Sequence, residues 1–139
     1  SKPDRDGQVR AMKEALAEAG LAPQAIGYIN AHGTATLVGD VVECEAIRAV
    51  FEKTDVPVSS TKSMHGHLLG GAGALEMAAA LMPFSEGLLP PTAHLEQPDP
   101  ACVVRHVACK AEKVDPPRAV MSNSFAFGGS NVVLVAEKA

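Results

Sequence analysis

Ile26-Gly27-Tyr28-Ile29-Asn30-Ala31 is a short apolar run that stops abruptly at His32-Gly33-Thr34-Ala35-Thr36. This pattern is typical of a strand that feeds a loop. Asp40 can then cap a helix that ends near Lys53 and whose buried stripe holds Val41, Cys44, Ile47, Val50 and Phe51. Residues 56–60 form the next predicted strand. A strand, a helix and a strand of these lengths require a parallel, right-handed crossover, so the sequence predicts an α/β fold.

Helices are predicted on both sides of this unit. Upstream, apolar residues at three- and four-residue spacing predict a helix over 6–19 that stops at Gly20. Downstream, a loop over 61–66 leads through three glycines into a small-residue helix that reaches about Met82, where Pro83 helps to end it.

The last third of the chain completes the expected sheet. Four prolines in residues 88–100 predict an extended surface connection, and residues 102–107 suggest a short strand. Strands are predicted over 118–122 and 131–136, and the segment between them allows an antiparallel return. We therefore expect a mixed sheet with covering helices.

Length and composition exclude several classes of protein. The 139 residues predict one domain, residues 1–139, and 47% hydrophobic with 20% charged residues is a normal globular balance. A net charge of −4 without a basic block argues against nucleic-acid binding. No apolar stretch reaches the ~20 residues that cross a bilayer, and no signal peptide opens the chain. Three cysteines without CxxC spacing suggest no disulfide framework. We expect a soluble, cytoplasmic protein.

Candidate functional residues follow the predicted parallel strands. His32 follows one strand and residues 62–67 follow the next, so both loops lie at the carboxyl edge of the sheet, where α/β proteins bind ligands. The turn over 125–130 follows a third strand and can bring glycine-rich backbone to the same edge. Two imidazoles and backbone amides can stabilise a developing oxyanion, as acyl-transfer and enolate chemistry require. A nearby lysine can orient a histidine and keep it neutral.

Simpler interpretations stay open at this point. His32 could merely terminate a strand. His65, His67 and His32 lack a recognisable zinc-ligand pattern, so no metal site is predicted. The run Gly70-Gly71-Ala72-Gly73 lacks the spacing of a phosphate-binding loop and favours close helix packing. The cysteines are interpreted as buried small side chains rather than nucleophiles.

Three sequence blocks carry a family resemblance. They are residues 30–40 with Glu43, residues 59–73 (SSTKSMHGHLLGGAG) with Glu76, and residues 123–131 (NSFAFGGSN). In order and spacing they resemble the signature blocks of the elongating β-ketoacyl-[acyl carrier protein] synthases. The resemblance implies the thiolase fold and a Claisen condensation, in which malonyl-carrier protein loses CO₂ and its enolate attacks an acyl-cysteine. It implies no cofactor.

The resemblance also assigns roles to individual residues. His32 and His67 match the two catalytic histidines, and Lys62 matches the lysine that orders the second histidine, with Glu43 as its expected ionic partner. Thr34 and Thr36 match residues that would bind the pantetheine arm. Phe127, with Phe125 and Gly128 beside it, matches the gating phenylalanine, whose backbone amide would complete the oxyanion hole. Asp40 and Glu76 would support the site.

The resemblance covers only the C-terminal half of such an enzyme. The resemblance implies that the chain begins after the first strand of that half, and nothing in it resembles the motif of the nucleophilic cysteine. His65 stands where the family usually has threonine, Ala126 replaces a usual glycine, and Pro83 shortens a helix. The implied partners are acyl carrier protein and the N-terminal half, in a homodimeric full-length enzyme.

The sequence also allows comparison with other classes of protein. A non-catalytic partner subunit such as a chain-length factor is the main alternative, although such a subunit would not need both histidines. A thiolase would carry a Gly-His-Pro motif and a second cysteine in Cys-x-Gly, and both are absent from this sequence. The initiating synthases pair one histidine with asparagine, so Lys62 and two histidines favour the elongating type.

Overall fold

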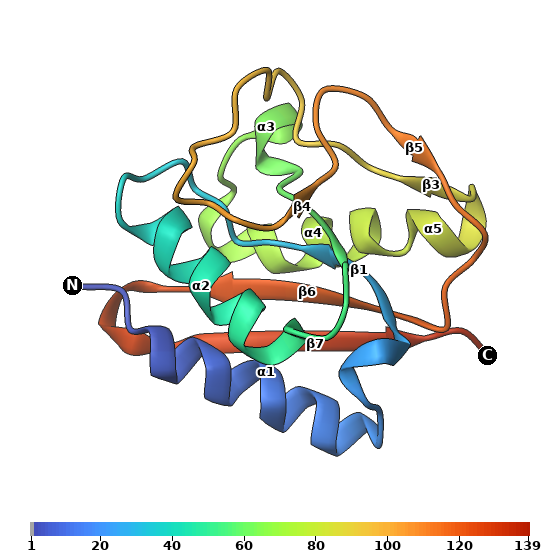
Figure 1. Ribbon diagram of the computed structural model, residues 1–139, viewed down its shortest axis with the longest axis horizontal. Helices are drawn as coiled ribbons and strands as arrows, with labels where there is room; N and C mark the ends of the chain where they lie inside the picture. The colour runs from blue at the N-terminus through green and yellow to red at the C-terminus, as the bar shows by residue number, and fades with distance from the viewer. Residues whose placement is uncertain (1) are drawn as a thin grey trace.

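A five-stranded mixed sheet forms the centre of the molecule. The structure, a computed structural model, describes residues 2–139, except for the side chain of Phe127. The strand order is β4-β2-β1-β6-β7 (Figure 1). The strands are β1 (Ile26–Asn30), β2 (Pro57–Ser59), β4 (Arg105–His106), β6 (Ala119–Phe125) and β7 (Asn131–Glu137).

The predicted parallel crossover is confirmed. β1 and β2 run parallel, with Ile29 opposite Val58, and helix α2 (Gly39–Phe51) connects them. β6 lies parallel to β1 on its other side, and β7 returns antiparallel to β6. The carboxyl ends of β1, β2 and β6 therefore share one edge of the sheet.

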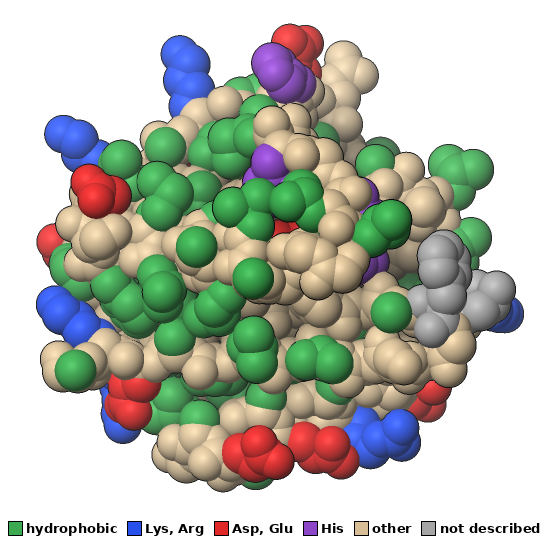
Figure 2. Space-filling view, turned by 180° about the vertical axis from the view of Figure 1, so that it is seen from behind, with side chains coloured by type: hydrophobic (Ala, Val, Ile, Leu, Met, Phe, Trp, Pro, Cys, Tyr) green, Lys and Arg blue, Asp and Glu red, His purple; other side chains and the backbone are tan. Residues whose placement is uncertain are grey.

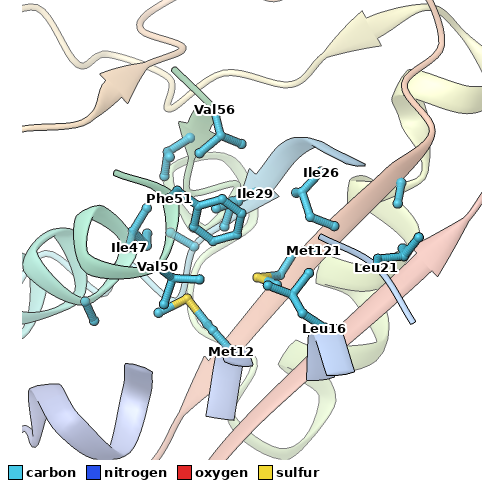
Figure 3. Packing of buried hydrophobic residues seen from close by; sticks show 14 residues of the cluster. Met12, Leu16, Leu21, Ile26, Ile29, Ile47, Val50, Phe51, Val56 and Met121 are labelled. Atoms are coloured by element: carbon cyan, nitrogen blue, oxygen red, sulfur yellow. The ribbon is translucent and has the colours of Figure 1, made fainter. Parts of the chain in front are cut away.

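Helix α1 (Arg5–Ala19) and α2 cover one face of the sheet. Asp4 caps α1 by accepting a hydrogen bond from the Asp6 backbone N–H, and Gly20 ends it in the left-handed conformation. Met12 and Leu16 of α1 pack with Ile47, Val50 and Phe51 of α2 above strand residues such as Ile29 and Met121 (Figure 3). Met12 and Ile29 are fully buried, so this layer is a true core.

The opposite face carries α4 (Ala72–Ala80) and α5 (Met82–Ser85). A short antiparallel pair, β3 (Leu88–Leu89) and β5 (Glu112–Lys113), lies beside α5. A second apolar cluster holds this layer against the sheet and consists of Tyr28, Ala80, Leu89, Val107 and Val120. Single turns of 3₁₀ helix complete the chain at η1 (Pro23–Ala25), η2 (Leu69–Gly71) and η3 (Phe127–Gly129).

Three local expectations were wrong. α2 begins at Gly39, whose backbone N–H donates to Thr36 Oγ1 at 3.1 Å, and Asp40 lies within the first turn instead of capping the helix. Residues 61–66 are not all loop, because α3 (Lys62–His65) forms there. Pro83 does not end the preceding helix: α4 stops at Ala80, and Pro83 lies in the first turn of α5, where its missing N–H is tolerated.

No helix among residues 2–139 combines the length and the apolar character needed to span a bilayer.

Candidate active site

The predicted loops converge at the carboxyl edge of the sheet. His32 lies two residues beyond β1, and His67 follows the α3 turn that comes after β2. The two imidazoles meet with ring centroids 5.5 Å apart and planes at 85°. An acceptor about 2.9 Å from a ring nitrogen lies about 4 Å from that ring's centre. Two centres at this separation can therefore both reach one oxygen atom.

Lys62 lies beside the first histidine rather than the second. Its Nζ is 3.5 Å from His32 Nδ1 and forms a buried ion pair with Glu76 of α4. The expected ionic partner, Glu43, was therefore wrong, as was the expectation that Lys62 orders His67. An ammonium group only donates hydrogen bonds, so His32 Nδ1 must accept and the proton of the neutral ring is on Nε2.

The surroundings of His32 keep its ring neutral. Burial, the positive charge of Lys62 and the neighbouring His67 together lower the pKa of His32 from 6.5 to about 4. Desolvation is the largest of these causes, because burial penalises the charged imidazolium. At neutral pH His32 is thus a hydrogen-bond donor through Nε2 that carries no charge.

His67 has the same tautomer for a different reason. Its Nδ1 accepts a hydrogen bond from the backbone N–H of Leu69 at 3.2 Å. When neutral, the ring therefore carries its proton on Nε2 as well. Its side chain is exposed, whereas that of His32 is half-buried. The site thus holds two adjacent Nε2–H donors.

Glu43 instead anchors the backbone that carries His32. Its two carboxylate oxygens accept from the backbone N–H groups of His32 at 2.8 Å and Gly33 at 2.9 Å. Asn123 Nδ2 of β6 donates to the same carboxylate at 3.2 Å. Burial raises the pKa of Glu43, and these hydrogen bonds oppose that shift. The carboxylate ties the loop after β1 to both α2 and β6.

A tight backbone contact also shapes this loop. Gly33 has φ +36°, and a Cβ there would lie 2.6 Å from Ser60 Cβ. Ser60 Oγ donates to Gly33 O at 2.9 Å, which fixes the loop after β1 against the end of β2. Only glycine allows this approach at that φ.

A cleft of about 600 Å³ opens beside the histidines. Thr34, Thr36, Lys62 and His67 line it, while the ring of His32 packs against His67 next to it. The Thr36 hydroxyl accepts a hydrogen bond from the backbone N–H of Gly39 at the N-terminus of α2, so part of its hydrogen-bonding capacity is used within the protein. Burial raises the pKa of Asp40, which also lines the cleft. The space and its polar rim suit an extended, flexible ligand.

The third predicted loop reaches the site with its first residue, Phe125. Phe125, the last residue of β6, is buried with its ring 6.1 Å from that of His32. Gly128 lies in η3 with φ +83° and is exposed. The side chain of Phe127 is outside the described part of the chain, so its gating role stays a prediction.

Two cysteines also line the cleft, and neither is an activated thiol. Cys44 on α2 is buried, and desolvation raises its pKa, as it does that of Cys102. Cys109 lies on the surface. A thiol that resists ionisation, as those of Cys44 and Cys102 do, is a poor nucleophile. The expectation that all three cysteines are buried was wrong for Cys109, which is exposed.

A buried polar network beneath the histidines was missed by the sequence analysis. Asn30 Nδ2 donates to Thr61 Oγ1 at 2.9 Å and to the Glu76 carbonyl at 3.0 Å, so β1, α3 and α4 are joined. Asn30 and Thr61 are 0% and 1% exposed. A polar residue ending an otherwise apolar strand was the available signal, because buried amides need partners.

The chain is similar to known proteins in both sequence and fold. Residues 1–96 match the family described as "Beta-ketoacyl synthase, C-terminal domain". The 3-oxoacyl-[acyl-carrier-protein] synthase 2 of Synechocystis sp. is 46% identical over 98% of this chain and 33% of its own length. The crystal structure of a beta-ketoacyl synthase from Burkholderia phymatum superimposes with a TM-score of 0.94 and 40% identity, covering 100% of this chain and 34% of that one.

A third relative was solved with a partner. It is a type II polyketide synthase acyl-carrier protein in complex with its ketosynthase bound to the hexaketide. The matched chain is 29% identical with a TM-score of 0.91, covering 100% of this chain and 35% of that chain.

These likenesses define the fold as that of the thiolase-like ketosynthases. The chain belongs to the beta-ketoacyl synthase family and represents its C-terminal domain. It spans about one third of the length of the curated relatives that it matches.

Proposed function

We propose that this chain is the part of a 3-oxoacyl-[acyl carrier protein] synthase that binds a malonyl thioester and stabilises its enolate. The observation that carries the proposal is the pair of imidazoles, His32 and His67, whose Nδ1 atoms both accept hydrogen bonds, so that each Nε2 can donate, and whose rings are close enough to share one oxygen. Preorganised donors of this kind stabilise charge that develops in a transition state.

The reaction proceeds in two balanced steps. The carbon–carbon bond to the malonyl carboxylate breaks, CO₂ leaves, and the electron pair moves onto the thioester oxygen as an enolate. The enolate carbon then attacks an acyl-cysteine thioester, forms the new carbon–carbon bond and releases the cysteine thiolate. His32 and His67 donate to the enolate oxygen throughout. The nucleophilic cysteine belongs to a part of the full-length enzyme that these residues do not include.

Lys62 and Glu76 act on His32 rather than on the substrate. The ammonium group holds the His32 proton on Nε2 and disfavours the imidazolium form. Thr34 and Thr36 line the cleft where the pantetheine arm of the substrate would enter. Acyl carrier protein as the donor partner is supported by the related ketosynthase that was solved with its carrier protein.

An apolar face fits a second lobe of the same enzyme. Leu75 and Leu81 on the α4 side are 39% and 38% exposed, and Val132 and Leu134 of β7 are 54% and 46% exposed. Hydrophobic side chains spread widely over this side of the molecule (Figure 2). Exposed apolar side chains that gather on one face are typical of an interface. We propose that this face packs against the N-terminal half of the enzyme, and that the full-length protein is a homodimer.

One assay separates this proposal from a non-catalytic, chain-length-factor-like subunit. The full-length protein is incubated with malonyl-carrier protein, and CO₂ release is measured without an acyl primer. The proposal predicts catalysed decarboxylation, and release at the uncatalysed rate would refute it. The 139-residue chain alone is expected to form no acyl-enzyme, so an acyl adduct on it in mass spectrometry would contradict the placement of the nucleophile elsewhere.

A further inference from the structure

His65 lies between Lys62 and His67 in the sequence, and both of its ring nitrogens are within hydrogen-bond distance of a partner. Nδ1 is 2.8 Å from the Gly66 carbonyl oxygen, and Nε2 is 3.0 Å from Thr61 Oγ1. A carbonyl only accepts, so His65 Nδ1 carries a proton, and in the neutral ring Nε2 is the acceptor. The Thr61 hydroxyl already accepts from Asn30 Nδ2 and therefore can donate its own proton to His65 Nε2.

This arrangement connects an exposed loop to the buried frame. Thr61 and Asn30 are almost completely buried, and Asn30 also donates to the Glu76 carbonyl in α4. The ring of His65 is thus oriented from the buried residues Asn30 and Thr61, through its contact with the Thr61 hydroxyl. It can transmit that orientation to the peptide that its Nδ1 contacts.

The contacted peptide is the one that places His67. Gly66 has φ 76° and ψ −175°, a backbone region that is nearly restricted to glycine. Glycine has many alternative conformations of similar energy, so hydrogen bonds on both of its sides select one. The Gly66 N–H donates to the Lys62 carbonyl at 2.8 Å. The hydrogen bond from His65 holds the Gly66 carbonyl, and the same peptide plane carries the backbone nitrogen of His67.

We propose that His65 is a positioning residue for His67, acting through its Nδ1–H donation to the Gly66 carbonyl. The expected effect on decarboxylation rests on the proposed function, whereas the expected effect on the orientation of His67 does not. His65 touches no reacting atom. It orients the Gly66–His67 peptide so that the two imidazoles meet.

Three substitutions in the full-length protein separate the two contacts of the ring. In His65→Asn the side-chain amide nitrogen lies near the former Nδ1 and keeps the donation to Gly66. In His65→Gln the carboxamide oxygen lies near the former Nε2 and keeps only the bond from Thr61. His65→Ala removes both contacts. Unfolding midpoints are measured for all three, and the Asn–Gln comparison remains decisive if the Ala variant fails to fold.

The primary measurement is the ¹⁵N signals of the His67 ring, which report its tautomer without any substrate. We expect the wild type and His65→Asn to show a protonated Nε2, and His65→Gln and His65→Ala to show averaged tautomers. For malonyl decarboxylation, kcat should fall on the order of 10- to 100-fold in Gln and Ala, with KM changed less. Asn should restore most of kcat.

Two results would overturn the inference. One is an unchanged His67 tautomer in His65→Ala or His65→Gln, and the other is rescue by Gln but not by Asn. If the wild type does not decarboxylate malonyl-carrier protein, the proposed function fails, yet the ring signals still decide whether His65 positions His67.

Discussion

His32 and His67 stand edge to face with their ring centroids 5.5 Å apart, although they come from two separate strand-to-loop connections. Nδ1 of His32 accepts from Lys62 Nζ, and Nδ1 of His67 accepts from the backbone N–H of Leu69. The Nε2 atom of each ring is therefore left as the donor, and the ring of His32 carries no charge at neutral pH. Under the proposed function, this pair of donors would bind the enolate oxygen.

Loss of either imidazole should remove most of the decarboxylation. We expect His32→Ala and His67→Ala each to lower kcat by roughly 10²–10³-fold, the cost of deleting one oxyanion donor. CO₂ release from malonyl-carrier protein is the measurement. His94→Ala, at an exposed histidine outside the site, serves as the control. Near-normal turnover in either site variant would show that the two rings do not share the substrate oxygen.

The Lys62–Glu76 pair should matter for stability because it is buried. The two side chains are 6% and 1% exposed. Glu76→Gln leaves an uncompensated buried ammonium and should cost about 3–5 kcal/mol of unfolding free energy. The double variant Lys62→Met/Glu76→Gln should recover part of that loss. Chemical denaturation measures the unfolding free energy of each variant, with Glu14→Gln on the surface of α1 as the control. The pairing would be contradicted if the loss in the double variant equalled the sum of the losses caused by the two single substitutions.

The pKa of His32 sets a pH dependence with a defined sign. The folded protein keeps His32 neutral down to about pH 4, whereas an unfolded histidine takes up its proton near 6.5. The unfolded state therefore binds more protons between these values, and the unfolding free energy should fall as the pH falls through this window. NMR titration of the His32 ring checks the pKa directly.

Removal of the lysine charge should raise that pKa. In Lys62→Met/Glu76→Gln the burial of His32 remains but the second cause of its shift is gone, so the ring should protonate at a higher pH than in the wild type. Lys13→Met, at an exposed position of α1, is the matched control. An unchanged His32 titration would mean that Lys62 does not influence the ring.

Gly33→Ala should disturb the site more than the fold. The new Cβ meets Ser60 Cβ at 2.6 Å with φ at +36°, so the loop that carries His32 must shift. We expect a cost of about 1–2 kcal/mol for the backbone conformation together with a marked loss of kcat. Gly70→Ala is the control, because nothing lies within 4 Å of a Cβ there. Unimpaired activity in Gly33→Ala would show that the loop tolerates displacement.

Much of the fold was predictable from local patterns. The apolar run that ends at Asn30, the helical stripe of α2 and the following strand each bury one face, and their order leaves only a parallel crossover. The same order places His32 and His67 at one edge. Short elements escaped prediction, since α3 (Lys62–His65) and the pair β3–β5 contain too few residues to show a period.

The charge pairing within the site could not be inferred from sequence. Glu43 and Glu76 are both acidic residues near the motifs, and only tertiary distance decides which one meets Lys62. α2 directs Glu43 toward the backbone N–H groups of His32 and Gly33, while α4 brings Glu76 beneath the lysine. Likewise, the contacts of His65 depend on the helical turn that was not foreseen.

The most direct test of the shared donor pair is a structure of the full-length protein with a stable malonyl-thioester analogue. We predict that the thioester carbonyl oxygen lies within hydrogen-bond distance of Nε2 of both His32 and His67. An analogue whose carbonyl oxygen contacts only one ring, or neither, would contradict the account.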